Sequence, residues 1–121
     1  MVATEVSGSF VLKDKNLLMV KDEETGKLNI PSDTGQRGEL SADTAERVIE
    51  EHVGCECIEM KYKKRLKTVF ELEGDEYRLQ PYHVEIEGEP EEVEWVHIEE
   101  LDDKELATPI ESIKKEIKER F

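Results

Sequence analysis

The chain has 121 residues, of which 40% are charged and 36% hydrophobic, and 31 acids against 17 bases give a net charge of −14. This length fits one domain, residues 1–121, with a single core. The acidic excess opposes binding to duplex nucleic acid or anionic membranes. We therefore expect a small molecule or a protein as partner.

No apolar run approaches the roughly 20 residues of a membrane span, and the opening residues lack the layout of a signal peptide. These two observations predict a cytoplasmic location.

Three short strands with turn signals between them are expected in the first forty residues. The segments are "SFVLKD" (9–14), "NLLMVKD" (16–22) and "KLNIP" (27–31), separated by "KDKN" and "DEETGK". This order predicts a β meander. The composition of "PSDTGQRG" (31–38) then predicts a loop.

A helix is expected over residues 41–53, with Ser41 as its N-cap and Gly54 as its stop signal. Apolar residues recur in it at helical spacing, and these are Ala45, Val48, Ile49 and Val53. The helix should therefore pack this side against the core.

Extended segments dominate the rest of the chain: residues 55–74, residues 76–88 after the turn "EGDE", and "VEWVHI" (93–98). A final helix is expected over 108–121, with a Thr108 cap, Glu111 at the capping-box position and a buried stripe of Ile110, Ile113 and Ile117. The order of strands, helix, strands and helix predicts an α+β or mixed-sheet α/β sandwich.

The segment from residue 33 to residue 55 resembles the signature of the Nudix (MutT-like) superfamily, G-x5-E-x7-R-E-U-x-E-E-x-G-U, where U is a bulky apolar residue. Glu39, Arg47, Ile49, Glu51 and Gly54 stand at the expected spacings. The resemblance implies an α/β/α sandwich with a central mixed sheet, in which Glu39 and Arg47 form a structural ion pair. It also implies metal-dependent pyrophosphohydrolysis of nucleoside diphosphate-linked compounds.

Three positions depart from this signature. Asp33 stands at the first glycine, Val48 at the glutamate after the arginine, and His52 at the second glutamate of the pair. In the family, carboxylates of this helix hold magnesium, which prefers oxygen ligands. Only Glu51 remains of the three, so we expect weak magnesium or manganese binding and impaired catalysis.

The candidate metal residues are Glu51, His52 and Glu50, and two of them have a simpler interpretation. His52 could bind zinc, manganese or nickel, or it could be a solvated residue at the helix end. Glu50 lies one position out of register and would reach the site only if the helix wound differently. Asp33 could bring a carboxylate near the site, or it could be an ordinary turn residue.

Further candidates lie downstream. Glu91 and Glu92 could join Glu51 in catalysis, because some relatives place a metal ligand or base in this region, although acidic runs are usually solvated. The segment "KYKKRLK" would align Lys61, Lys63, Arg65 and Lys67 on one strand face. Lys63 and Arg65 are therefore candidate phosphate-binding residues, or else a solvated face.

Two alternatives to an impaired hydrolase remain open. One is a nucleotide-binding module without catalysis, and the other is a protein-interaction module that uses its acidic surface. The aromatic residues could stack on a base, although most should belong to the core or the sheet surface. These residues are Tyr62, Phe70, Tyr77, Tyr82 and Trp95.

Overall fold

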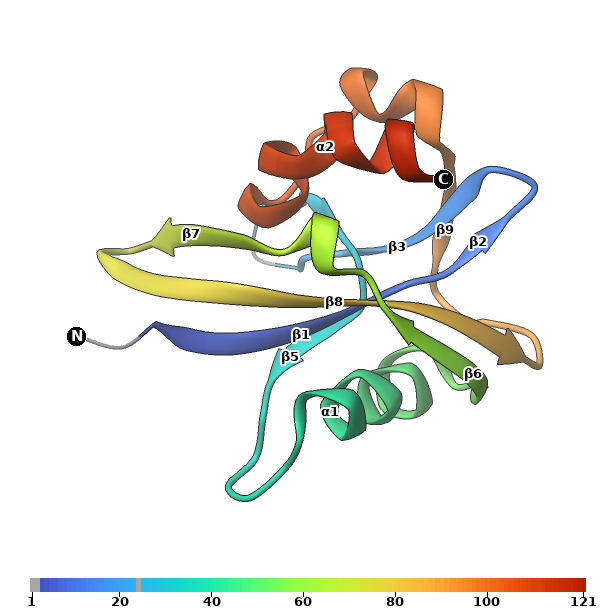
Figure 1. The fold of residues 1–121 in the computed structure, drawn as a ribbon. Helices are drawn as coiled ribbons and strands as arrows, with labels where there is room; N and C mark the ends of the chain where they lie inside the picture. Colours follow the sequence, from blue (N-terminus) through green and yellow to red (C-terminus); the bar gives the residue numbers. More distant parts are fainter. Residues whose placement is uncertain (1–2, 24) are drawn as a thin grey trace.

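The computed structural model describes residues 3–23 and 25–121 and contains two sheets with helices on opposite sides (Figure 1). The first sheet has the order β5-β1-β8-β6, and β7 also pairs with β8. Its strands are β1 (Thr4–Phe10), β5 (Ser32–Thr34), β6 (Glu56–Tyr62), β7 (Thr68–Leu72) and β8 (Asp75–Glu87). β1 runs parallel to β8 and the other pairs are antiparallel, so the sheet is mixed.

The second sheet is formed around β3 (Asn16–Lys21). Its neighbours are β2 (Leu12–Lys13), β4 (Leu28–Asn29) and β9 (Glu94–His97), all antiparallel to it. Asp14 and Lys15 both have positive φ in the two-residue turn between β2 and β3, which suits the twist of a hairpin.

One helical segment covers each side of the first sheet (Figure 1). α1 (Ser41–Val48) continues directly into a π-helical turn, η1 (Ile49–Val53), and the pair lies on one side. α2 (Thr108–Arg120) lies on the other, near the short 3₁₀ helices η2 (Lys64–Leu66) and η3 (Ile98–Asp103). The expected mixed-sheet sandwich is therefore present. Within the described residues, no helix has the length and apolar character that crossing a membrane requires.

Two buried clusters hold these layers together. The larger one lies under α2 and includes Phe10, Leu79, Ile110, Ile113 and Ile117. The smaller one lies under α1 and η1 and includes Leu18, Ala45, Ile49, Val53 and Val84. The apolar stripes expected on both helices are therefore the surfaces that pack.

The N-caps of both α-helices differ from the sequence prediction. Leu40 occupies the N-cap of α1 and Ala107 that of α2. At neither of these two positions does a side chain form a capping hydrogen bond. Ser41 and Thr108 lie one residue inside the helices. The Ser41 hydroxyl instead lies 2.6 Å from the Tyr82 hydroxyl, so the serine ties α1 to β8.

The meander prediction is correct only for β2, β3 and β4. β1 belongs to the other sheet, where it pairs with β5 and β8. Part of the expected loop 31–38 is strand, because residues 32–34 pair antiparallel with β1 as β5. A local turn signal could not show this pairing, since its partner lies more than twenty residues away.

The single strand face expected for Lys61, Lys63, Arg65 and Lys67 is absent from the described residues. β6 ends at Tyr62, and the chain turns through η2 before β7 begins. Leu66, the last residue of this turn, is fully buried in the cluster under α2. The four basic residues therefore do not lie in one row.

Candidate functional site

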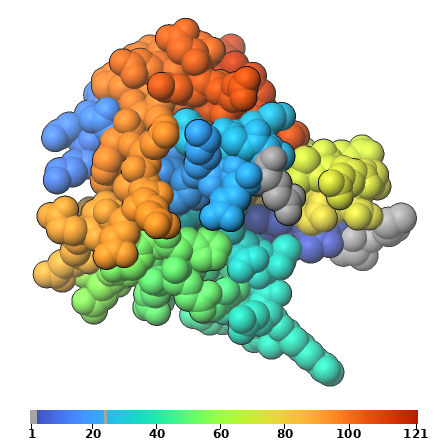
Figure 2. Space-filling view, turned by 180° about the vertical axis from the view of Figure 1, so that it is seen from behind, coloured from blue at the N-terminus to red at the C-terminus, as the bar shows by residue number. Residues whose placement is uncertain are grey.

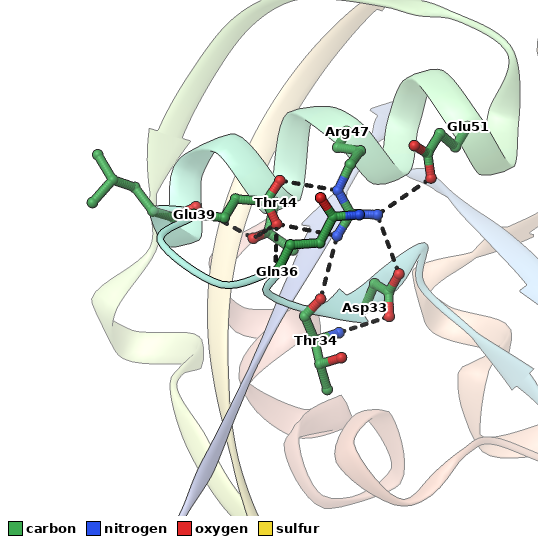
Figure 3. Close-up of polar contacts among 8 residues, drawn as sticks. Asp33, Thr34, Gln36, Glu39, Thr44, Arg47 and Glu51 are labelled. Carbon is green, nitrogen blue, oxygen red and sulfur yellow. Dashed lines mark hydrogen bonds and ion pairs between the residues drawn. The ribbon is translucent and has the colours of Figure 1, made fainter.

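Arg47 gathers three carboxylates on the side of α1 that faces β5 (Figure 3). Its Nε donates to Glu39 Oε2 at 3.0 Å and its Nη2 donates to Glu39 Oε1 at 3.1 Å, which makes a bidentate pair. Its Nη1 lies 3.3 Å from Asp33 Oδ2 and 3.2 Å from Glu51 Oε2. The guanidinium thus joins β5, the loop before α1 and the π-helical turn.

Glu39 is the most strongly held of these acids. The Gln36 N–H donates to its Oε1 at 3.0 Å, and the buried Thr44 hydroxyl donates to the same oxygen at 2.7 Å. The bonds from Arg47, then those from Gln36 and Thr44, lower the pKa of Glu39 to about 2. Glu39 is therefore ionised at neutral pH and fixes the loop against α1.

Asp33 belongs to this cluster rather than to an isolated turn. It lies in β5, where its Oδ1 accepts a bond from the Thr34 N–H at 2.8 Å and its Oδ2 faces Arg47. The carboxylate that replaces the signature glycine therefore lies near Glu51 and shares Nη1 of Arg47 with it. Of the two interpretations of Asp33, the geometry favours a carboxylate near the helical segment Ser41–Val53, which carries the signature and which we call the box helix.

Val48 contributes packing and no ligand. It is fully buried, with an exposed fraction of 0%, as are its neighbours Ala45 and Ile49. On the same helix, the Ala45 carbonyl accepts a 2.8 Å bond from the buried Ser9 hydroxyl, which anchors α1 to β1. The position where the family signature has a glutamate therefore faces the protein interior.

The winding changes at the next residue. Residues 49–53 form a π-helical turn, which holds one residue more than an α-helical turn, and Gly54 ends it with φ of 74°. Sequence spacing predicted the helix bounds but not this winding. Side chains after Val48 are consequently rotated away from their α-helical directions.

The three candidate metal residues of this turn point in different directions. Glu51 faces Arg47. Glu50 lies on the side of Cys57, where its charge, after burial and Glu46, contributes to raising the pKa of that thiol. His52 lines a surface hollow. Among the described residues, the ion pairs of Arg47 are with Asp33, Glu39 and Glu51 and not with Glu50.

This first hollow, of about 750 Å³, brings together two residues from the sequence candidates, His52 and Glu92. The rest of its wall comes from β3 and the turn after it and includes Lys21, Asp22 and Glu23. In Figure 2, blue residues of β3 lie directly above the green helical segment, and orange residues that follow β8 lie to the left. The sequence prediction missed Lys21, which carried no signal beyond its place at a strand end.

A second hollow, of about 410 Å³, lies across the same turn, and Asp22 lines both. Its apolar wall includes Phe70 and Tyr77, whose rings stack with centroids 5.5 Å apart. Its polar lining includes Lys27, Asn29 and Ser32, and Ser32 immediately precedes Asp33 in β5. An aromatic wall and a charged wall therefore adjoin on one side of the molecule.

The remaining candidates lie elsewhere. Lys63 Nζ is 5.7 Å from the centre of the Phe121 ring. Neither Lys63 nor Arg65 lines either hollow. The N–H of Glu91 donates to the Val53 carbonyl at 3.2 Å, which ties the loop after β8 to η1.

A magnesium ion needs several oxygen ligands in octahedral geometry. Among residues 3–23 and 25–121, no group of three or more His, Cys, Asp or Glu side chains is placed to hold a metal ion. Glu51 is paired with Arg47, and His52 offers nitrogen, which magnesium disfavours. The donors present do not fit this metal.

No protein-family model matches the sequence, and no curated protein matches it significantly. Solved structures do match. A NUDIX hydrolase from Nitrosomonas europaea has a TM-score of 0.82 at 16% identity, covering 98% of this chain and 89% of that one.

Two further matches have the same architecture. A MutT protein from Bacillus halodurans has a TM-score of 0.75 at 22% identity, covering 93% of this chain and 80% of the other. An Ap4A hydrolase from C. elegans has a TM-score of 0.75 at 12% identity and covers 98% of both chains. At these identities the likeness establishes the α/β/α fold, which confirms the fold predicted from the sequence.

Proposed function

We propose, from the Nudix fold of this chain, that it binds a nucleoside diphosphate-linked compound and hydrolyses the diphosphate link only slowly. The observation that carries this proposal is which side chains stand at the metal-binding positions of the box helix and what they contact. Val48 is fully buried, and Glu51, the carboxylate that remains of the three signature positions on the helix, is paired with Arg47. One structural neighbour is an Ap4A hydrolase, which supports a nucleotide-like ligand.

The two adjoining hollows suit the two halves of such a ligand. A planar base would lie against the partly buried Tyr77 ring of the second hollow, which Phe70 supports from the core, because aromatic faces stack on bases. The diphosphate would then lie in the first hollow near Lys21, the basic residue of its wall. Asn29 and Ser32 offer hydrogen bonds to the part of the ligand that links the base to the diphosphate.

Slow turnover follows from the donors present. Hydrolysis of a diphosphate depends mainly on stabilising negative charge in the transition state, and losing one such stabilising group costs about 10² to 10³ in rate. Two of the three helix positions that hold carboxylates in the family signature are Val48 and His52 here. We therefore expect binding to survive better than catalysis.

The test is a titration of ADP-ribose followed by amide NMR shifts, with and without magnesium. We expect shifts at Lys21 and Tyr77. Lys21→Gln should weaken binding about tenfold, which corresponds to about 1.4 kcal/mol for a lost charged contact. Lys115→Gln, an exposed lysine on α2, is the matched control and should leave affinity unchanged.

A release assay for AMP, under the same conditions, distinguishes an impaired hydrolase from a nucleotide-binding module without catalysis. Slow release above the rate without protein supports the impaired hydrolase, and binding without release supports a nucleotide-binding module. Absence of binding for ADP-ribose, a dinucleoside tetraphosphate and a nucleoside triphosphate would contradict the proposal.

A further inference from the structure

A third hollow, of about 600 Å³, lies between the β2–β3 hairpin, β6, the end of β8 and the first residues of β9. We call it the β6–β9 groove. It shares no lining residue with the two hollows of the proposed ligand site. Its surface continues the smaller core outward, because Val11 and Val84 belong to that core and also line the groove.

Two large apolar side chains stand exposed in this groove. Ile58 is 55% exposed and Trp95 is 38% exposed. Ile58 lies where the register between β6 and β8 shifts, between Cys57 and Glu59, so it has no opposite partner in the ladder. Exposed apolar groups from separate strands that share one groove are typical of a binding surface.

The charge around the groove is negative. Asp14, Glu85 and Glu89 line it, against Lys13 as the basic residue of its lining. Burial, followed by the charges of Glu89 and Glu91, raises the pKa of the nearby Cys55 thiol. The apolar floor therefore lies in a negative local field.

We propose that the β6–β9 groove docks a basic segment of a partner protein, in which a large apolar side chain is flanked by lysine or arginine. The apolar side chain would contact Ile58 and Trp95, and the basic residues would pair with Glu85 and Glu89. A cation beside the indole of Trp95 gains further attraction from the ring. A second copy of this chain fits less well, because each copy carries a net charge of −14.

The chain supplies its own reporter, because Trp95 is its single tryptophan. The probe is a capped octapeptide with two central leucines flanked by lysines, titrated against tryptophan fluorescence. We expect a saturable change that weakens with added salt. The same peptide with glutamates in place of lysines should leave the fluorescence unchanged.

Matched variants separate docking from general attraction to an acidic protein. Ile58→Ser should weaken binding at least fivefold, whereas Val69→Ser, an equally exposed apolar residue on β7, should not change it. Glu85→Lys should weaken binding more than Glu71→Lys, which makes the same charge change on β7 away from the groove.

The proposal would be overturned by an unchanged fluorescence, by equal weakening in each variant and its control, or by equal affinity for the glutamate peptide. Concentration-dependent dimerisation that Ile58→Ser abolishes would also overturn it, since the groove would then bind a second copy. Loss of ADP-ribose binding leaves this inference standing, because the two surfaces share no residue.

Discussion

Replacing Val48 and His52 together by glutamate tests whether these positions are the lost ligands of a metal site. The double variant returns three carboxylates, with Glu51, to the box helix. Val48 is fully buried, so the change removes an apolar burial worth about 1.5 to 3 kcal/mol and adds a charge that the interior disfavours. His52 is exposed, and its replacement should change stability by no more than about 0.5 kcal/mol.

We therefore expect the double variant to lose about 3 kcal/mol of unfolding free energy, a large part of the 5 to 15 kcal/mol typical of such domains. At a metal concentration about 100 times the dissociation constant, binding to the folded state would restore about 2.7 kcal/mol. For a chain of this length, that is a rise in melting temperature of roughly 10 °C. Calorimetric melts with and without manganese measure it.

The matched control is Val48→Gln with His52→Gln. It loses the same apolar contact and gains similar bulk without charge, so its melting temperature should respond to manganese no more than that of the parent. Identical responses of the two double variants would refute the reasoning, and residues 47–55 would then be an ordinary amphipathic helix end.

Three further predictions concern the same segment. The pKa of Glu39 is lowered from 4.5 to about 2, so its stabilisation is present above about pH 4.5 and is lost as pH falls toward 2; Glu39→Gln should lower stability at pH 7 and flatten that acid dependence in circular-dichroism melts. Magnesium should bind with a dissociation constant in the millimolar range or weaker, and calorimetric titration of Glu51→Gln should differ little from the parent; tight binding that this variant abolishes would show another carboxylate at work. Gly54→Ala should cost about 1 to 2 kcal/mol in denaturant unfolding, because φ is 74° while no surrounding side chain would obstruct the added methyl group; an unchanged midpoint would contradict this account of the helix end.

Much of the local structure could be predicted from the sequence. The spacing of Ala45, Val48, Ile49 and Val53 predicted a helix with the bounds observed, because residues three or four apart share one side of a helix. Gly54 ends it because glycine enters the left-handed conformation at little cost. The turn residues between β2 and β3 likewise predicted their hairpin.

The contacts around the site could not be predicted in this way. Asp33 reached Arg47 only because β5 pairs with β1, a pairing between segments far apart in sequence. His52 and Glu92 share a hollow because the loop after β8 lies against η1, where the Glu91 N–H meets the Val53 carbonyl. The basic residues after β6 do not lie in their expected row because the chain turns through η2, where Leu66 is buried.

There is a physical reason why the local structure could be predicted from the sequence and the contacts around the site could not. Periodicity and turn chemistry act over a few residues, and their energies are set by the local backbone, so the sequence by itself determined where the helices and most strands lie. The π-helical winding of residues 49–53, the ion pairs of Arg47 and the walls of the hollows depend on which distant surfaces pack together. Only the tertiary structure decided these, because burial of the two cores sets the direction in which each neighbouring polar side chain points.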